Sequence, residues 1–240
     1  MNLLKGILLL IIFITPIKAN TIYNLIKIPN LEIYKLNTKN KLRYFYAASS
    51  FRLGVKKNIV CLSSDKKNYD EKYKIISQNL DRYSRNFLKK INLKYIVLCE
   101  DLSISGINTA GIPDHIMKTL IIDINFNEKY FPRVIHHEVF HIINDSHKEL
   151  FDKNEWINFN EEYFEYAKCS TCSDRLGLDT YSKTSGFLTE YSKTTPSEDM
   201  AEVFSHLMFN VRFFNNDPIL EKKKEFIIKN ILKIDNTFKF

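Results

Sequence analysis

The clearest pattern along the chain is an apolar stripe between residues 69 and 87, where large side chains recur at alternating steps of four and three. This spacing places them on one face of an α-helix, with charged residues on the other faces. The stripe is formed by Tyr69, Tyr73, Ile76, Leu80, Tyr83 and Phe87. We therefore expect one continuous helix here, with its aromatic face packed into the core.

Short apolar runs predict strands before and after that helix. Residues 43–47 and 58–62 are two such runs, and residues 95–99 and 118–124 are two more. β-Branched and aromatic residues are frequent in these runs, as they are in strands. The segment 111–114, Gly-Ile-Pro-Asp, is expected to be a loop because Gly and Pro interrupt regular structure.

Proline marks the start of two later helices. Pro132 and Pro196 each suit a first helical position, and apolar residues follow both at helical spacing. Residues 145–196, which join these helices, are rich in loops and are expected to form the wall of a cleft between them. A last helix is expected at residues 218–233. Without repeats or a flexible linker, the chain is expected to form one domain.

Two histidines on the first of these helices have the spacing of zinc ligands. His137-Glu138-x-x-His141 is an H-E-x-x-H motif, and side chains four residues apart share a helical face. Both imidazoles can then reach one Zn²⁺, while Glu138, about 100° round the helix, can take a proton from a zinc-activated water. The alternative is a half-buried helix with two unconnected histidines. His136 points away from the ligand face and is expected to be a bystander or to support a ligand.

A catalytic zinc site needs a third protein ligand, which we expect on the second helix. Glu198 and Glu202 share a face there, so one can bind the metal while the other holds a ligating histidine. Glu198 is the preferred ligand, and Glu202 and His206 are the alternatives. Thr195-x-x-Glu198 is also a capping box, in which Glu198 would serve only the start of the helix.

The combination of His137-Glu138-x-x-His141 with Glu198-x-x-x-Glu202 resembles the gluzincin arrangement of thermolysin-like and anthrax lethal factor-like peptidases. The segments 186–191 and 198–204 are similar to bacterial putative zinc-binding metallopeptidases. So is a spacing of aromatic and amide residues, Trp156-x-x-x-Asn160-x-x-x-Phe164-x-Tyr166. The resemblance covers about residues 93–210. It departs in its linker, because 56 residues separate the last histidine of the motif from Glu198.

This resemblance implies a fold and roles for further residues. The fold would be α+β, a zincin-like single domain with a small mixed sheet, an H-E-x-x-H helix and a second ligand-bearing helix. The strand at residues 118–124 would form the sheet edge and pair with an extended peptide, unless its apolar run marks an interior strand. Tyr191, seven residues before Glu198, would donate a hydrogen bond to the reaction's oxyanion, unless it is only a packed loop residue. Glu202 would orient His137.

Residues 1–19 are expected to be a secretory signal peptide. Lys5 supplies the basic start, residues 7–15 are apolar, and cleavage would follow Ala19. An uncleaved membrane anchor is the alternative, but about a dozen apolar residues are short for a bilayer. The domain at residues 20–240 would then be exported, to the periplasm or out of the cell, with no stable membrane insertion.

The charge of the chain changes this picture little. The net charge is +7, and most basic residues are spread along the sequence. The densest run, Lys222-Lys223-Lys224, is expected to lie on the solvated face of the last helix. We therefore expect no nucleic-acid partner.

Four cysteines suggest disulfides in an exported protein, with three connectivities open. A redox role for Cys169-Ser-Thr-Cys172 is disfavoured because no thioredoxin-like frame surrounds it. A structural zinc site with Cys61 and Cys99 is disfavoured because only one C-x-x-C pair is present.

The sequence thus predicts an exported zinc metallopeptidase that hydrolyses peptide or protein substrates. Two alternatives remain: a non-catalytic extracytoplasmic binding protein with a structural zinc site, and a zinc hydrolase of non-protein substrates. Glu138 argues against the first, because a structural site has no use for a general base and would be closed by a fourth ligand. The oligomeric state is not predicted.

Overall fold

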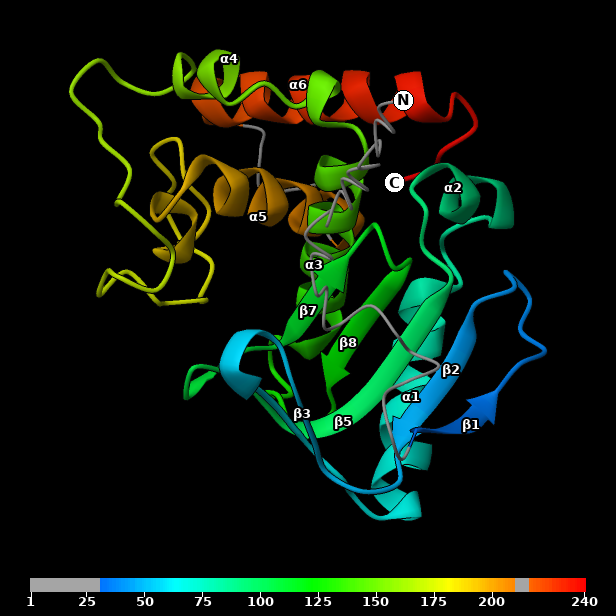
Figure 1. The fold of residues 1–240 in the computed structure, drawn as a ribbon. Helices are drawn as coiled ribbons and strands as arrows, with labels where there is room; N and C mark the ends of the chain where they lie inside the picture. Colours follow the sequence, from blue (N-terminus) through cyan, green and yellow to red (C-terminus); the bar gives the residue numbers. More distant parts are fainter. Residues whose placement is uncertain (1–30, 210–215) are drawn as a thin grey trace, which may run out of the picture.

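The computed structural model describes residues 31–209 and 216–240, so the expected signal peptide lies outside the described residues (Figure 1). The strands are β1 (Leu31–Lys35), β2 (Arg43–Ala47), β3 (Phe51–Leu53), β4 (Ile59–Leu62), β5 (Tyr95–Ile104), β6 (Ile107–Asn108), β7 (Gly111–Asp114) and β8 (Thr119–Asp123). The helices are α1 (Lys66–Leu80), α2 (Arg85–Lys90), α3 (Phe131–Ser146), α4 (Lys153–Ile157), α5 (Pro196–Phe209) and α6 (Pro218–Ile234). Short 3₁₀ turns are η1 (Val55–Lys57), η2 (Lys148–Leu150) and η3 (Tyr191–Lys193). The expected α+β class is confirmed.

The long strand β5 is the centre of a curled mixed sheet and changes partners along its length. Its first half lies between β2 and β8 and runs parallel to both. Its second half pairs antiparallel with β4 and, at the end, with β6. The other pairs, β1 with β2, β3 with β4 and β7 with β8, are antiparallel. All four strands expected from the sequence are present, although β5 extends to Ile104.

Among the described strands, β7 forms the edge of the sheet beside α3, which corrects two expectations. β8 lies between β5 and β7, so it is an interior strand, as its apolar run also allowed. The segment Gly111–Asp114, expected as a loop, is the strand at this edge. Pro113 is compatible with that place because an edge strand leaves one row of its backbone groups outside the ladder.

The aromatic stripe at residues 69–87 belongs to two helices rather than one. α1 ends at Leu80, and α2 starts after Ser84, whose hydroxyl accepts the N–H of Phe87 at 3.1 Å. A serine in this capping role stabilises a new helix start, so the expectation of one continuous helix is wrong. The expectation of a core face is confirmed, because five of the six stripe residues are buried and Tyr73 packs against them.

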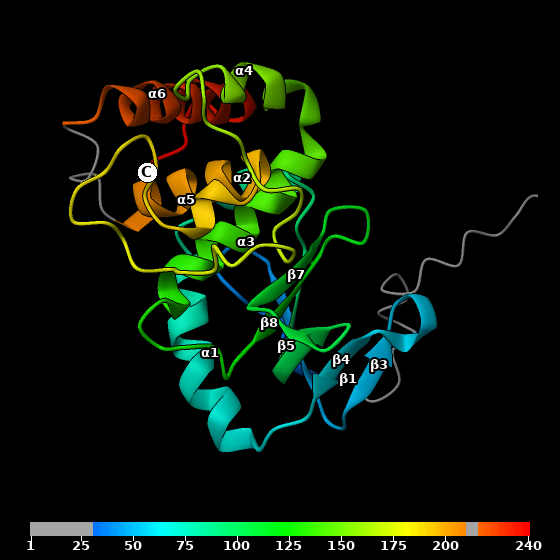
Figure 2. The same cartoon turned by 90° about the vertical axis from the view of Figure 1, so that its left-hand side faces the viewer.

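The two faces of the sheet are covered differently. Figure 2 shows α1 and α3 on the same side of the sheet. There, sheet residues such as Ile96 and Leu120 join side chains of α1, α3, α5 and α6 in the larger apolar core. Alternate residues, such as Val97 and Ile121, join a smaller cluster on the opposite face. The alternation arises because successive side chains of a strand point to opposite faces of the sheet. The apolar side chains of one face pack against α3 and hold it on the sheet.

The four cysteines form two pairs. Cys61 of β4 pairs with Cys99 of β5 inside the smaller cluster, and Cys169 pairs with Cys172 in the loop before η3. One of the three connectivities is thereby selected, and it fits an exported protein. Within the described ranges, no helix combines the length and the apolar character needed to cross a bilayer.

Candidate metal centre

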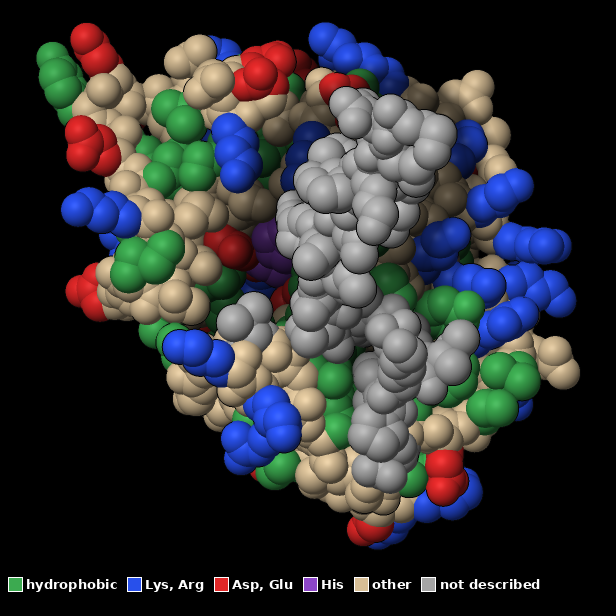
Figure 3. Space-filling view, in the orientation of Figure 1, with side chains coloured by type: hydrophobic (Ala, Val, Ile, Leu, Met, Phe, Trp, Pro, Cys, Tyr) green, Lys and Arg blue, Asp and Glu red, His purple; other side chains and the backbone are tan. Residues whose placement is uncertain are grey.

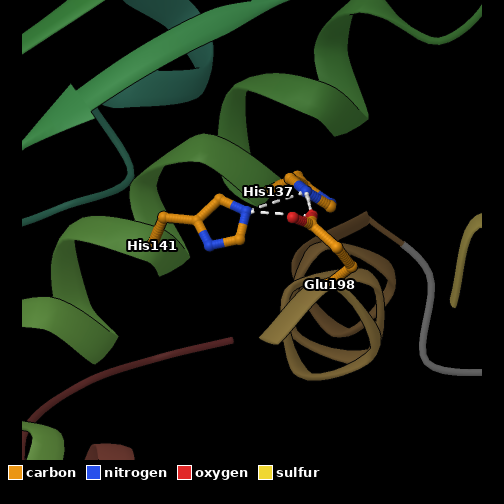
Figure 4. A group of neighbouring side chains, drawn as sticks. All are labelled: His137, His141 and Glu198. Carbon is orange, nitrogen blue, oxygen red and sulfur yellow. Dashed lines mark hydrogen bonds and ion pairs between the residues drawn. The ribbon is translucent and has the colours of Figure 1, made fainter. Parts of the chain in front are cut away.

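The H-E-x-x-H residues lie on α3, a helix with proline in its first turn and an apolar face against the core. Its buried positions include His137 and Glu138, while His141 is partly exposed. Figure 4 shows the two imidazoles turned toward α5, one turn apart. The helical spacing expected from the sequence is therefore present, and it aims both rings at the same point.

The third member of this group comes from the first turn of α5. Glu198 uses its backbone N–H for the helix start, which it donates to the hydroxyl of Thr195 at 3.2 Å. Its side chain points the other way, toward the two imidazoles (Figure 4). Helix capping therefore involves the backbone of Glu198 and leaves its carboxylate available to the site.

Three donor atoms converge at this point. The Oε2 atom of Glu198 lies 2.9 Å from Nε2 of His137 and 3.1 Å from Nε2 of His141. The two Nε2 atoms are 3.1 Å apart. Two imidazole nitrogens and a carboxylate oxygen are the donor set of a catalytic zinc site with three protein ligands. Within the described residues, this is the one group of at least three His, Cys, Asp or Glu side chains arranged to hold a metal ion.

Electrostatics also fit a cation between these atoms. Burial alone would raise the pKa of Glu198, but the charge of His141 and hydrogen bonds from both histidines hold it well below its usual range. Burial opposes protonation of His137, yet hydrogen bonds to Glu198 and Glu202 raise its pKa to about 10. The cluster therefore favours positive charge at its centre, which Zn²⁺ would supply in place of the proton.

Glu202 holds His137 from the side away from the cluster. Its Oε1 atom lies 2.9 Å from Nδ1 of His137, while Oε2 accepts hydrogen bonds from Arg133 at 2.5 Å and Thr189 at 3.0 Å. Burial would raise the pKa of Glu202, but the Arg133 guanidinium and the His137 hydrogen bond lower it to about 2. A carboxylate fixed in this way sets the orientation of the ring it contacts.

Arg133 and Thr189 were not identified by the sequence reasoning. Arg133 precedes His137 by four residues, so helical spacing alone puts it on the ligand face, and this signal was available. Thr189 lies in the loop before η3 and had no such signal. Its contact with Glu202 arises only because that loop passes over α5.

Glu138 lies against the edge strand. A Cβ atom on Gly111 of β7 would stand 2.8 Å from Cγ and 3.0 Å from Cδ of Glu138, closer than such atoms approach. Glycine at this position therefore makes room for the carboxyl group of Glu138. This group lies beside His137, His141 and Glu198, which are called the metal cluster below because they could hold a metal ion. Burial raises the pKa of Glu138 above its usual value.

Tyr191 lies in η3, next to His137. Its ring centroid is 5.8 Å from that of His137, and both residues line the same cleft. Burial, followed by the negative charges of Glu198 and Glu138, raises the pKa of Tyr191 well above its usual value. The phenol therefore keeps its proton and can act as a hydrogen-bond donor.

The remaining histidines of the two helices lie outside the cluster. His136 is buried, with Nδ1 at 2.6 Å from the hydroxyl of Tyr83 and Nε2 at 3.0 Å from Oδ1 of Asn79. His206 contacts Thr180 and the backbone carbonyl of Glu202. Neither ring points at the metal-binding group, so His206 is not its third member.

A second buried network fixes α5 from its opposite side. The Oδ2 atom of Asp199 accepts hydrogen bonds from Trp156 at 2.9 Å, Tyr166 at 2.6 Å and Lys223 at 2.6 Å. The spacing of Trp156, Asn160 and Tyr166 noted in the sequence thus serves this network, since Asn160 donates to the hydroxyl of Tyr166. Lys223 is fully buried, so its expected place on a solvated helix face is wrong. The carboxylate of Asp199, the residue after Glu198, offsets the cost of burying the charge of Lys223.

The metal cluster opens into a cleft of about 670 Å³ between the sheet and the helical part of the molecule. Its walls come from the β5–β6 hairpin, β7, α3, α5 and the loop at residues 170–178. The loop-rich segment at residues 145–196 contributes a wall, but the cleft does not lie between α3 and α5 as expected, because these two helices pack against each other. A cleft beside a metal site with a buried carboxylate is suited to hold a substrate next to the reactive groups.

The model of the putative zinc-binding metallo-peptidase family matches residues 80–225, more than half of the chain. The matched range contains the whole metal cluster, Glu138, Tyr191 and the buried Asp199–Lys223 pair. No curated protein matches the sequence.

Proposed function

Since the chain belongs to the putative zinc-binding metallo-peptidase family, we propose that it is an exported zinc-dependent peptidase with a zincin-like fold of the gluzincin type. The observation that carries the proposal is the convergence of His137, His141 and Glu198 beside Glu138 in an open cleft. These residues would hold Zn²⁺. A structural zinc site is closed by a fourth protein ligand, whereas this group of three opens to the cleft.

Bound zinc supplies Lewis acidity, which makes a water molecule more acidic and a carbonyl carbon more electrophilic. Side chains of the protein carry out the proton transfers. Glu138 accepts a proton from the attacking water and later delivers it to the leaving amine. Its raised pKa suits this exchange, because a base whose pKa lies closer to neutrality both accepts and returns a proton readily.

Two further side chains assist. Tyr191 donates a hydrogen bond to the oxyanion that develops on the substrate carbonyl, a role supported by its protonated phenol and its place in the cleft. Lethal factor-like peptidases, which the sequence resembles, also have a tyrosine seven residues before the ligand glutamate. We extend the role of that tyrosine to Tyr191. Glu202, fixed by Arg133, keeps the ring of His137 in its ligating orientation.

The substrate would bind as an extended peptide along β7. Among the described strands, β7 is a sheet edge, and its residues Gly111 and Pro113 both line the cleft. An edge strand offers backbone N–H and C=O groups that pair with a peptide regardless of its sequence. Export is supported by the two cysteine pairs and by the apolar segment at the N-terminus.

The decisive experiment compares the wild type with Glu138→Gln on a mixed peptide library. Gln keeps the size of the side chain but cannot take a proton, so the variant should bind zinc and lose nearly all cleavage. Zinc content is measured by elemental analysis, and a chelator should abolish wild-type cleavage. Full activity in the variant, or no cleavage of any peptide by zinc-loaded wild type, would refute the proposal.

A further inference from the structure

One end of the sheet carries basic side chains that are far apart in the sequence. β2, β5 and β8 run parallel, so all three strands start at this end. The N–H of Arg43 donates to the carbonyl of Lys94 at 3.0 Å, and the N–H of Lys94 donates to that of Lys118 at 2.8 Å. The exposed cations of these strand starts, of the turn before β2 and of the end of α2 are called the basic end of the sheet: Lys39, Lys41, Arg43, Lys89, Lys94 and Lys118.

The six cations of the basic end are not neutralised by ion pairs. Lys90, beside them, lies 3.7 Å from a carboxylate oxygen of Asp235. Within the described ranges, no ion pair involves any of the six. Figure 3 shows basic side chains gathered at the right edge of the molecule, over α2 and the turn between β1 and β2. Because like charges repel, an anionic partner that covers this surface is attracted to it.

Exposed aliphatic side chains stand in two turns at the same end of the sheet. Leu36, between β1 and β2, is 42% exposed, and Ile116, between β7 and β8, is 58% exposed. A soluble polyanion would use only the cations. A lipid bilayer uses both kinds of side chain, because its anionic headgroups attract cations while aliphatic side chains enter the boundary between headgroups and acyl chains. The combination therefore favours a membrane surface over a nucleic acid or an anionic polysaccharide.

We propose that the basic end of the sheet docks the protein on the surface of an anionic lipid bilayer, with Leu36 and Ile116 in the headgroup layer. This inference goes beyond the proposed peptidase function and does not depend on it. Each Lys or Arg close to an anionic bilayer strengthens binding by about fivefold. Several cations together with two aliphatic side chains give reversible binding that needs no membrane-spanning segment.

The test measures cosedimentation of the purified protein with two kinds of vesicle. One kind contains phosphatidylglycerol and phosphatidylcholine, and the other contains phosphatidylcholine alone. Binding to the anionic vesicles should be at least about 100-fold stronger and should weaken as salt is added, because salt screens the attraction. Equal affinity for the two kinds of vesicle would overturn the proposal.

A double variant tests whether the cations of the basic end are responsible. Lys89→Gln/Lys94→Gln should weaken binding to anionic vesicles by about 25-fold, because it removes two cations. Lys56→Gln/Lys57→Gln is the matched control and should weaken binding by less than about threefold. Both control residues are exposed and precede β4, whose residue Ile59 pairs with the far end of β5.

A second pair of variants distinguishes a bilayer from a soluble polyanion, for which heparin is the probe. Ile116→Ser should weaken binding to anionic vesicles by about tenfold and leave binding to heparin unchanged, because only a bilayer accepts the aliphatic side chain. Ile107→Ser should change neither. Ile107 is 50% exposed and also lies at a hairpin, but this hairpin is at the far end of β5.

Arg43→Gln/Lys118→Gln should repeat the loss seen with Lys89→Gln/Lys94→Gln, so that one misfolded variant does not decide the outcome. Equal losses in the variants of the basic end and in the lysine control would show that only net charge matters, and would overturn the proposal. Tighter binding to heparin than to anionic vesicles, with no effect of Ile116→Ser on either, would replace the bilayer by a soluble polyanion.

Discussion

Gly111 has no side chain, and Glu138 occupies the space that one would fill. The carboxyl group of Glu138 is thereby placed between the edge strand and the metal cluster. Its position depends on a residue of another element, not only on its place in the H-E-x-x-H motif. A catalytic group shifted by about 1 Å can cost on the order of 100-fold in rate.

We therefore predict that Gly111→Ala lowers kcat by about 100-fold while zinc content stays at the wild-type level. The added methyl group must displace Glu138 or the strand, because it would also lie only 3.1 Å from the carbonyl oxygen of Ile121. Gly177→Ala is the control, since its Cβ atom would meet its nearest neighbour, Glu190, at an ordinary 3.4 Å. Equal kcat values for the two variants would contradict the prediction.

Variants of Glu198, Glu202 and Tyr191 should differ from one another in zinc content and in turnover rate. Glu198→Ala should be free of zinc, because it removes a ligand. Glu202→Ala should bind zinc about 10- to 100-fold more weakly, because it removes only the support of His137. Tyr191→Phe should keep zinc and lose about 100- to 1,000-fold in turnover. Zinc titration and peptide kinetics measure these values. A fully metallated Glu198→Ala beside a zinc-free Glu202→Ala would reverse the assignment of the ligand.

At the scale of elements, α5 is held from two sides. Glu198 and Glu202 face α3, and Asp199 faces α4 and α6 through Trp156 and Lys223. The position of Glu198, the proposed carboxylate ligand, therefore depends on a helix that comes after it in the sequence. Because the Asp199–Lys223 pair is fully buried, removal of one partner leaves an uncompensated charge.

Lys223→Met should lower the free energy of unfolding by about 3–5 kcal/mol, the usual cost of breaking a buried ion pair. Lys222→Met, an exposed neighbour on the same helix, should change it by less than about 0.5 kcal/mol. Chemical denaturation of the two variants makes the comparison. If both unfold at the wild-type denaturant concentration, the network does not stabilise α5.

At the scale of the whole molecule, stability should depend on pH through Asp123, at the end of β8. Burial raises the pKa of this carboxyl to about 6. A raised carboxyl pKa means that the folded state binds more protons than the unfolded one between about pH 4 and 6. The stability that protonated Asp123 contributes is therefore lost as pH rises through this window, and the full penalty of its burial is present above pH 6.

Asp123→Asn should remove that penalty. We expect it to stabilise the protein at pH 8 by up to about 3 kcal/mol, and to have no such effect at pH 3.5, where both side chains are neutral. Asn can still accept the backbone N–H of Asn125, now 2.9 Å from Oδ1 of Asp123. Denaturant titrations at the two pH values measure the difference. A larger gain at pH 3.5 than at pH 8 would show that the sign is wrong.

Sequence patterns within single helices and strands were sufficient to predict much of the site. Proline and apolar spacing predicted the starts of α3 and α5, because both depend only on the backbone geometry of one helix. The same geometry predicted that His137 and His141 share a face. The donor chemistry of an H-E-x-x-H helix indicated zinc before any fold was considered. The positions of β2, β4, β5 and β8 followed from short apolar runs in the same way, whereas β7 did not.

Contacts between distant segments were decided by the tertiary structure. Only packing of α5 against α3 distinguishes Glu198, which meets both imidazoles, from His206, which does not. The edge position of β7, the burial of Lys223 and the pairing of the cysteines also depend on which elements become neighbours. Periodicity describes the face of an element but not its partner, because the partner is selected by burial summed over the whole core.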